Sequence, residues 1–210
     1  MIYFLCAIAA ILLTFVGSYW IDKLYEMPTA PLSFPEDISR RSRFRKPILA
    51  VALFLTNLQF ATVPSPKCFY LIVAAFFLLL ITMTDFEQYV IFDRMILPFT
   101  LIGFMAVFHL QMSFNHHLGA ALVGGGTFLL LAILTRGALG GGDIKLIAAL
   151  GIWFGPHNLS NVIAAGSILG GVAALIMLLV NKKDRKSYFA YGPYFTLTAI
   201  YILLSSLSLG

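Results

Sequence analysis

Two aspartates stand at the edges of apolar segments, where solvation does not favour a charge. Asp85 ends the apolar run 68–84, and Asp143 follows three glycines and begins the run 144–155. An ionisable group at the edge of a membrane segment indicates a functional site. Two neighbouring carboxylates share a proton, so one can take a proton from an attacking water while the other protonates a carbonyl oxygen. The pair is therefore suited to acid–base hydrolysis of a peptide bond.

Simpler interpretations exist for the same residues. Each aspartate could cap a helix or pair with Arg94 or Lys145. A metal-dependent or Ser-His-Asp mechanism needs a histidine, and all four histidines lie near loops on the opposite side of the predicted membrane topology. The adjacent His116 and His117 could suggest a metal site, but a polar outer loop explains them more simply. Carboxylate chemistry is therefore the main catalytic hypothesis, and no metal is expected.

Composition places the two aspartates in a membrane protein. Apolar residues make up 60% and charged residues 11% of the 210 residues, and the mean hydropathy is +0.92, whereas a soluble domain carries roughly 25% charged residues. The apolar runs are continuous rather than alternating, which favours transmembrane helices over a β-barrel. We expect an all-α polytopic membrane protein, formed by one membrane-embedded domain over residues 1–210. Its eight predicted spans lie at about 2–20, 47–63, 68–84, 95–110, 118–135, 144–155, 161–180 and 191–208.

Basic residues predict the orientation of these spans. Of the 14 lysines and arginines, 13 lie in or beside one set of loops, at 21–46, 85–94, 136–143 and 181–190. Only Lys67 lies on the other side, so the positive-inside rule assigns this set of loops to the cytoplasm. Both termini are then outside, and both aspartates lie at one depth on the inner face. The assignment needs the segment 144–155 to cross, although its helix would be only about 18 Å long against a core of about 30 Å.

The net charge of +5 follows from the same asymmetry. Basic residues that flank a membrane are explained by anionic lipid, so the lipid bilayer rather than a nucleic acid is the expected partner. The two cysteines, Cys6 and Cys68, form no zinc framework. Both are expected to be free thiols, with a disulfide between them as the alternative.

Four stretches of the chain, in order, resemble one known family, the type IV prepilin leader peptidases, which are membrane aspartic proteases with a Gly-x-Gly-Asp motif. The stretches are GSYWIDKLYEMP at 17–28, TDFEQYVIFDRMILP at 84–98, GGGDIKLIAALGIWFG at 140–155 and FAYGPYFTLTA at 189–199. The Gly-x-Gly-Asp motif alone is a weak signal. The ordered set is specific, and it covers nearly the whole chain.

The resemblance implies a prepilin peptidase, an aspartic endopeptidase of the bacterial cytoplasmic (inner) membrane. Such an enzyme removes the basic leader from type IV prepilins or pseudopilins, ahead of their apolar helix, at the cytoplasmic face, and serves a type IV pilus or a protein-secretion system. Asp85 and Asp143 match its catalytic pair. The remaining matched positions are expected to support the motif: Gly140, Gly142, Lys145, Asp93, Gly192 and Pro193.

The loop at 21–46, expected to be cytoplasmic, departs from part of this family. It has no cysteine, whereas bifunctional members carry two zinc-binding Cys-x-x-Cys pairs there, so the chain is similar to shortened members. Zinc is therefore not expected, N-methylation of the new N-terminus is not supported, and S-adenosylmethionine would be a cofactor only if that activity is retained. The alternative is a proton- or ion-coupled transporter with the two aspartates as a relay. Their position at one edge and the lack of an internal repeat favour the peptidase.

Overall fold

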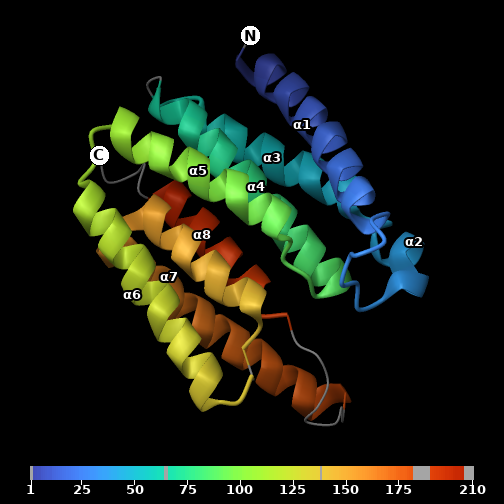
Figure 1. Cartoon of the computed structure of the whole chain (residues 1–210). Coiled ribbons are helices and arrows are strands. Elements are labelled where there is room, and N and C mark those ends of the chain that lie inside the picture. The colour runs from blue at the N-terminus through green and yellow to red at the C-terminus, as the bar shows by residue number, and fades with distance from the viewer. Residues whose placement is uncertain (1, 64–65, 138, 182–189, 206–210) are drawn as a thin grey trace.

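The computed structural model describes residues 2–63, 66–137, 139–181 and 190–205, and within these ranges the chain contains helices and no strand (Figure 1). The all-α prediction is therefore confirmed. Most of the predicted loop at 181–190, with its basic cluster, lies outside the described residues. The helices are α1 (Ile2–Tyr25), η1 (Pro35–Asp37, a 3₁₀ helix), α2 (Ile38–Arg41), α3 (Arg45–Phe60), α4 (Lys67–Gln88), α5 (Asp93–His109), α6 (Phe114–Leu134), α7 (Gly141–Asn181) and α8 (Gly192–Ser205).

The described part of each predicted span lies largely in a helix, and α7 contains two of the spans. Four helical segments are long and apolar enough to cross a membrane: α1, α4, α6 and Gly141–Val180 of α7. Helices α3, α5 and α8 are shorter, with 16, 17 and 14 residues. Large apolar side chains such as Phe4 and Phe15 are exposed on α1, as expected of a helix that faces lipid.

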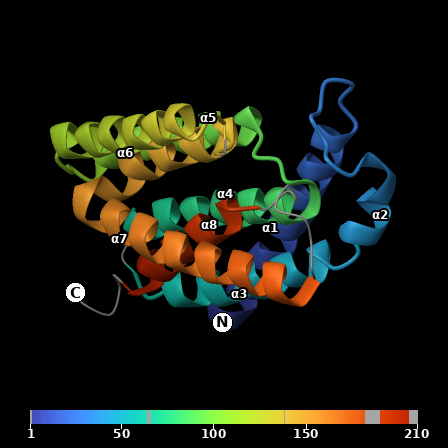
Figure 2. The same cartoon turned by 90° about the horizontal axis from the view of Figure 1, so that it is seen from below.

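Helix α7 consists of two arms that meet at Gly155. This glycine has a left-handed φ of 66° with ψ −176°, a conformation that residues with a Cβ rarely adopt. The next residue, Pro156, has no N–H to donate to the carbonyl of Ile152, one turn earlier. The ring of His117 replaces that donor, with its Nδ1 2.7 Å from the Ile152 oxygen. The chain therefore reverses direction, and the two arms run back along one another (Figures 1 and 2).

The helices form a layered bundle. Helix α6 packs against α7, α1 packs against α3, and α8 packs against both α4 and α7. Figure 2 shows α5 and α6 on one side of the bundle and α3 on the other, with α4 and α8 between them. Helices α4 and α8 therefore lie at the centre of the molecule, and α8 packs against α7 on its other side.

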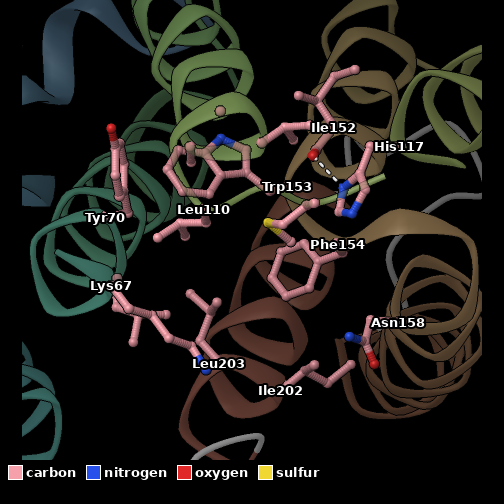
Figure 3. A pocket seen from close by; sticks show the side chains of 15 residues that line it. Lys67, Tyr70, Leu110, His117, Ile152, Trp153, Phe154, Asn158, Ile202 and Leu203 are labelled. Carbon is pink, nitrogen blue, oxygen red and sulfur yellow. Dashed lines mark hydrogen bonds between the residues drawn. The ribbon is translucent and has the colours of Figure 1, made fainter. Parts of the chain in front are cut away.

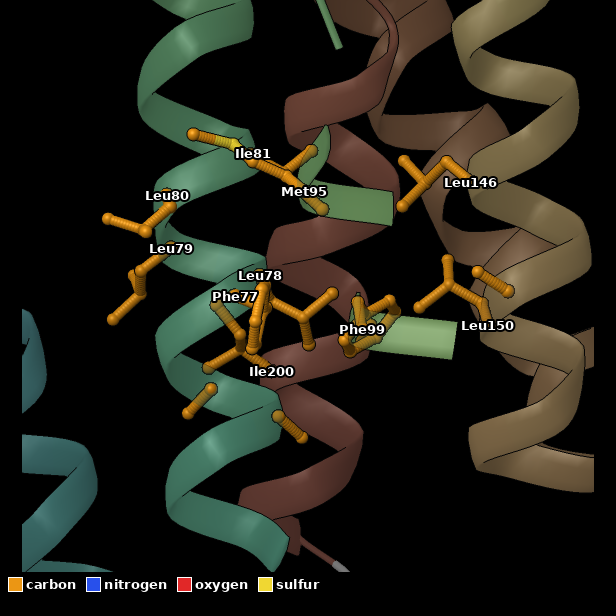
Figure 4. Close-up of a cluster of buried hydrophobic side chains, with 14 of the residues drawn as sticks. Phe77, Leu78, Leu79, Leu80, Ile81, Met95, Phe99, Leu146, Leu150 and Ile200 are labelled. Atoms are coloured by element: carbon orange, nitrogen blue, oxygen red, sulfur yellow. The ribbon is translucent and has the colours of Figure 1, made fainter. Parts of the chain in front are cut away.

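The interior is filled by side chains from the central helices (Figure 4). Leu78 of α4, Met95 and Phe99 of α5 and Leu150 of α7 are completely buried. The indole of Trp153 stacks on Phe99 at 5.2 Å between ring centroids, and its Nε1 donates to the Phe99 carbonyl at 2.9 Å. This packing holds the first arm of α7 against α5. It therefore determines where the N-terminus of α7 lies relative to α5.

Candidate active site

The structure brings the two predicted aspartates together at one end of the bundle. Asp85 lies in the last turn of α4, and Asp143 lies in the first turn of α7. Their carboxylates are close enough to interact electrostatically, although 57 residues separate them in the sequence (86–142). Helix α4 ends just beyond Asp85 because Tyr89 adopts a left-handed conformation, with φ 53° and ψ 41°. The chain then turns into the segment that precedes α5.

Asp85 is held by the beginning of α8. Its carboxylate accepts a hydrogen bond from the backbone N–H of Gly192, and the side chain is nearly completely buried. A Cβ added at Gly192 would lie 2.5 Å from Oδ2 of Asp85 and 2.9 Å from Cδ1 of Ile91. Glycine is therefore required for this close approach. Pro193 follows in the first turn of α8, where a missing N–H costs no helical hydrogen bond.

Asp143 is held by the turn that precedes its own helix. Its carboxylate accepts a hydrogen bond from the backbone N–H of Gly140, as an acidic residue in the first turn of a helix often does. The other carboxylate oxygen, Oδ1, is buried and has no hydrogen-bond partner among the described residues. A Cβ added at Gly142 would lie 2.9 Å from the Cβ of Ile91. Asp143 thus caps α7 with one oxygen and keeps the other available for a ligand.

Lys145, two residues beyond Asp143, is paired with another carboxylate. Lys145 Nζ lies 2.7 Å from both carboxylate oxygens of Asp93, and both side chains are largely exposed. Within the part of the chain that the structure describes, neither Asp85 nor Asp143 forms an ion pair. Pairing with Arg94 or Lys145, the simpler interpretation from the sequence, is therefore not observed. Asp93 and Lys145 instead connect the start of α5 to the N-terminal part of α7.

The sequence did not predict a buried polar network two residues beyond Asp85. Arg45 Nε lies 2.9 Å from Glu87 Oε1, and Arg45 Nη1 lies 2.6 Å from Asp22 Oδ1. The hydroxyl of Tyr25 donates to Glu87 at 3.0 Å. The sequence shows Arg45 at the start of an apolar segment and Glu87 close to Asp85, but it does not show that these two residues pair. The network joins α1, α3 and the end of α4.

The connection between α1 and α3 is fastened onto the same end of α4. The Gln88 side chain donates to the carbonyl of Phe34 at 3.0 Å and accepts from its N–H at 2.9 Å. Arg41 donates to the carbonyl of Glu87 at 3.0 Å and stacks 3.8 Å from the centroid of the Phe34 ring. The predicted cytoplasmic loop therefore lies beside the aspartates.

An open pocket of about 410 Å³ lies next to Asp143. Three segments surround it, namely the beginning of the connection after α1, the turn between α4 and α5, and the beginning of α7. Its lining residues include Pro31, Ile91, Arg94, Gly142 and Lys145. Gly142 and Ile91, which both line the pocket, also contact one another beside the two aspartates.

A second cavity, of about 360 Å³, lies at the opposite end of α4 (Figure 3). Tyr70, His117 and Trp153 line it, and the Tyr70 hydroxyl is 2.9 Å from Nδ1 of His109. Among the described residues, no group of three or more His, Cys, Asp or Glu side chains could hold a metal ion. Both cysteines are free thiols. This cavity is not part of the site formed by the two aspartates.

Apolar helices around a pair of carboxylates at one end of a bundle define an α-helical membrane protein with a candidate acid–base site. Residues 72–175 match the sequence model of the Type IV leader peptidase family, a protease family. This part of the chain, which contains both aspartates, is therefore similar to that family.

Curated relatives agree with this assignment. The chain is 35% identical over 130 residues to the "Prepilin leader peptidase/N-methyltransferase" of Neisseria gonorrhoeae, an alignment that covers 58% of the chain and 43% of the relative. It is 30% identical over 136 residues to the protein of that name from Pectobacterium carotovorum subsp. carotovorum, with 60% and 47% covered. The Pseudomonas aeruginosa protein is 29% identical over 133 residues, with 60% and 46% covered. The chain thus spans less than half the length of these relatives. No solved structure matches it.

Proposed function

We propose that this protein is an aspartic endopeptidase that removes the basic leader from type IV prepilins or pseudopilins at the cytoplasmic face of the bacterial inner membrane. One observation carries the proposal. Two carboxylates from separate helices meet at one end of the bundle, each held by a glycine N–H, and neither is neutralised by a cation among the described residues. The match of residues 72–175 to the model of a protease family supports the same reaction. The whole chain, 1–210, is proposed to form one membrane-embedded domain.

In the proposed reaction, a water held between the carboxylates attacks the scissile carbonyl carbon. Asp143, at the positive end of the α7 dipole, takes the proton of that water through its unpartnered Oδ1. Asp85 gives its proton to the carbonyl oxygen, which produces a tetrahedral diol. Asp143 then returns a proton to the leaving nitrogen as the C–N bond breaks, and Asp85 takes a proton from the diol as the new carboxyl group forms. Both carboxyl groups end in their starting states.

The acidic residues that could attract a basic leader differ in their contacts and exposure. Four acidic residues in the inner loops, Glu36, Asp37, Glu87 and Asp93, are candidates by charge. Glu87 is buried against Arg45, and Asp93 is paired with Lys145. Glu36 and Asp37 are exposed in the connection that is fastened beside the aspartates. We therefore assign the electrostatic attraction of the leader to these two carboxylates.

The proposal covers leader cleavage only. The names of the relatives also include an N-methyltransferase activity, but the chain covers less than half of each relative. The connection at 21–46 contains no cysteine, so neither zinc nor S-adenosylmethionine is part of the proposal. A transporter relay would need acidic groups near the middle of the bilayer, whereas these aspartates lie in a last and a first helical turn.

Cleavage of a purified prepilin tests the proposed function. Wild-type protein is expected to release the leader, and Asp85→Asn and Asp143→Asn are each expected to lose about 100-fold or more of the rate, the usual contribution of one acid–base group. Glu26→Gln, which changes an exposed carboxylate just beyond α1, serves as the control and is expected to cleave normally. Cleavage that survives both aspartate substitutions would refute the dyad. Proton flux into liposomes without any cleavage would favour the transporter.

A further inference from the structure

Two buried hydroxyl groups connect α4 to α8 directly beneath the candidate dyad. The Oγ1 atoms of Thr82 and Thr196 are 2.6 Å apart, and both residues are essentially inaccessible. Thr82 Oγ1 also lies 2.7 Å from the carbonyl oxygen of Leu78 in its own helix. Each hydroxyl carries one proton, so both short contacts are satisfied together when Thr196 donates to Thr82 and Thr82 donates to Leu78. The pair is a directed hydrogen bond between two helices.

The position of this pair relates it to Asp85. Thr82 precedes Asp85 by three residues and Thr196 follows Gly192 by four, and residues at these spacings lie one turn apart on the same helix face. The Thr196 hydroxyl is also 3.1 Å from the carbonyl of Gly192, so the two positions are in contact. The hydroxyl pair therefore lies one turn below the place where the Gly192 N–H meets the Asp85 carboxylate.

We propose that Thr82 and Thr196 are positioning residues for the dyad. Their hydrogen bond prevents α8 from sliding along its axis or rotating about it relative to α4. The Gly192 N–H therefore stays bonded to the Asp85 carboxylate, and Asp85 stays directed toward Asp143. The fit at Gly192 is too close to tolerate a shift, because even one methyl group there would lie 2.5 Å from Asp85 Oδ2. This inference rests on the proposed peptidase function, and it adds two buried residues that act through Asp85.

Isosteric substitutions test the proposal without leaving a cavity. Thr82→Val and Thr196→Val are each expected to lower kcat for prepilin cleavage about tenfold, because small errors in the position of a reacting group are costly, while KM changes less than about twofold. Both changes remove the same hydrogen bond, so the double variant should be no slower than the slower single variant. Thr82→Ser and Thr196→Ser retain the hydroxyl and should restore most of the rate.

Thr198→Val provides a matched control in the same helix. Thr198 is buried, and among the described residues its hydroxyl bonds only within its own helix, to the carbonyl of Tyr194 at 2.7 Å. Its substitution should leave kcat within about twofold while lowering the melting temperature about as much as the other threonine-to-valine changes. Equal losses of kcat in Thr198→Val and Thr196→Val would overturn the proposal, and so would additive losses in the double variant.

Hydrogen exchange gives a readout that does not depend on catalysis. The amide of Gly192 should exchange slowly in the wild-type protein and in Thr198→Val, and faster in Thr82→Val and Thr196→Val. Unchanged exchange in both of the latter variants would overturn the positioning role, whether or not the protein cleaves prepilins. Failure of the wild-type protein to cleave, with the expected exchange pattern, would instead refute the proposed function alone.

Discussion

Each aspartate of the candidate dyad is held by a backbone N–H rather than by a charged side chain. Gly192 donates to Asp85 and Gly140 donates to Asp143. A lysine or arginine in these places would fix its partner as a carboxylate. Neutral donors orient the two groups and leave each of them free to take up and release a proton, which the proposed reaction requires. The glycines at this site therefore have a chemical as well as a steric purpose.

Gly192→Ala tests the steric part of this arrangement. The added Cβ would meet Asp85 Oδ2 at 2.5 Å, so either the carboxylate or the start of α8 must move. We expect cleavage to fall about 100-fold, the scale of loss produced by a misplacement of about 1 Å. Gly126→Ala is the control, because an added Cβ there meets no atom within 4 Å. Equal activity of the two variants, measured as kcat with a prepilin, would contradict this explanation.

Among the helices, α7 shows how one element can supply two predicted spans. Hydropathy separates 144–155 from 161–180, and the residues between them lack a continuous apolar pattern. The structure continues the helix through 156–160, because Pro156 is well suited to the first turn after the break at Gly155. The sharp reversal depends on Gly155 and on a polar partner from α6, and the identity of that partner is not visible from the local sequence.

His117→Leu tests that partner. The substitution leaves the Ile152 carbonyl buried without its donor, and an unsatisfied buried group costs about 1–3 kcal/mol. We expect the free energy of unfolding of the purified protein in detergent to fall by about that amount. Tryptophan fluorescence, recorded as the protein unfolds, measures this change. His116→Leu changes the exposed neighbour and should have little effect. Equal stability of the two variants would show that His117 does not stabilise the turn.

What the sequence could predict depends on whether a feature is local. The apolar runs predicted the bounds of most helices to within a few residues. The number of membrane spans between Asp85 and Asp143 placed both residues at the same end of the bundle. The pairs Arg45–Glu87 and Thr82–Thr196 could not be predicted, because they depend on how helices rotate against one another. The side of the membrane on which each loop lies follows from the order of the spans along the chain. Contacts between side chains depend instead on how the helices pack.

On the scale of the whole molecule, the two ends of the bundle differ in charge and chemistry. The end with the dyad also carries the buried Arg45 network and the exposed pair of Lys145 and Asp93. The opposite end holds the cavity of about 360 Å³, lined by His117 and Lys67. Because anionic lipid and the insertion process retain basic residues on the cytoplasmic side, this asymmetry predicts that the dyad faces the cytoplasm.

Thiol labelling in intact cells tests this orientation. In a chain with Cys6→Ala and Cys68→Ala, which removes both free thiols, we would introduce Ser33→Cys at the dyad end or Thr62→Cys at the opposite end; both positions are exposed. A membrane-impermeant maleimide added outside should label only the cysteine at 62, because polar reagents do not cross the hydrocarbon core. After the membrane is permeabilised both should react, which controls for accessibility. Labelling of the cysteine at 33 in intact cells would place the dyad outside, away from any cytoplasmic leader, and would contradict the proposed substrate.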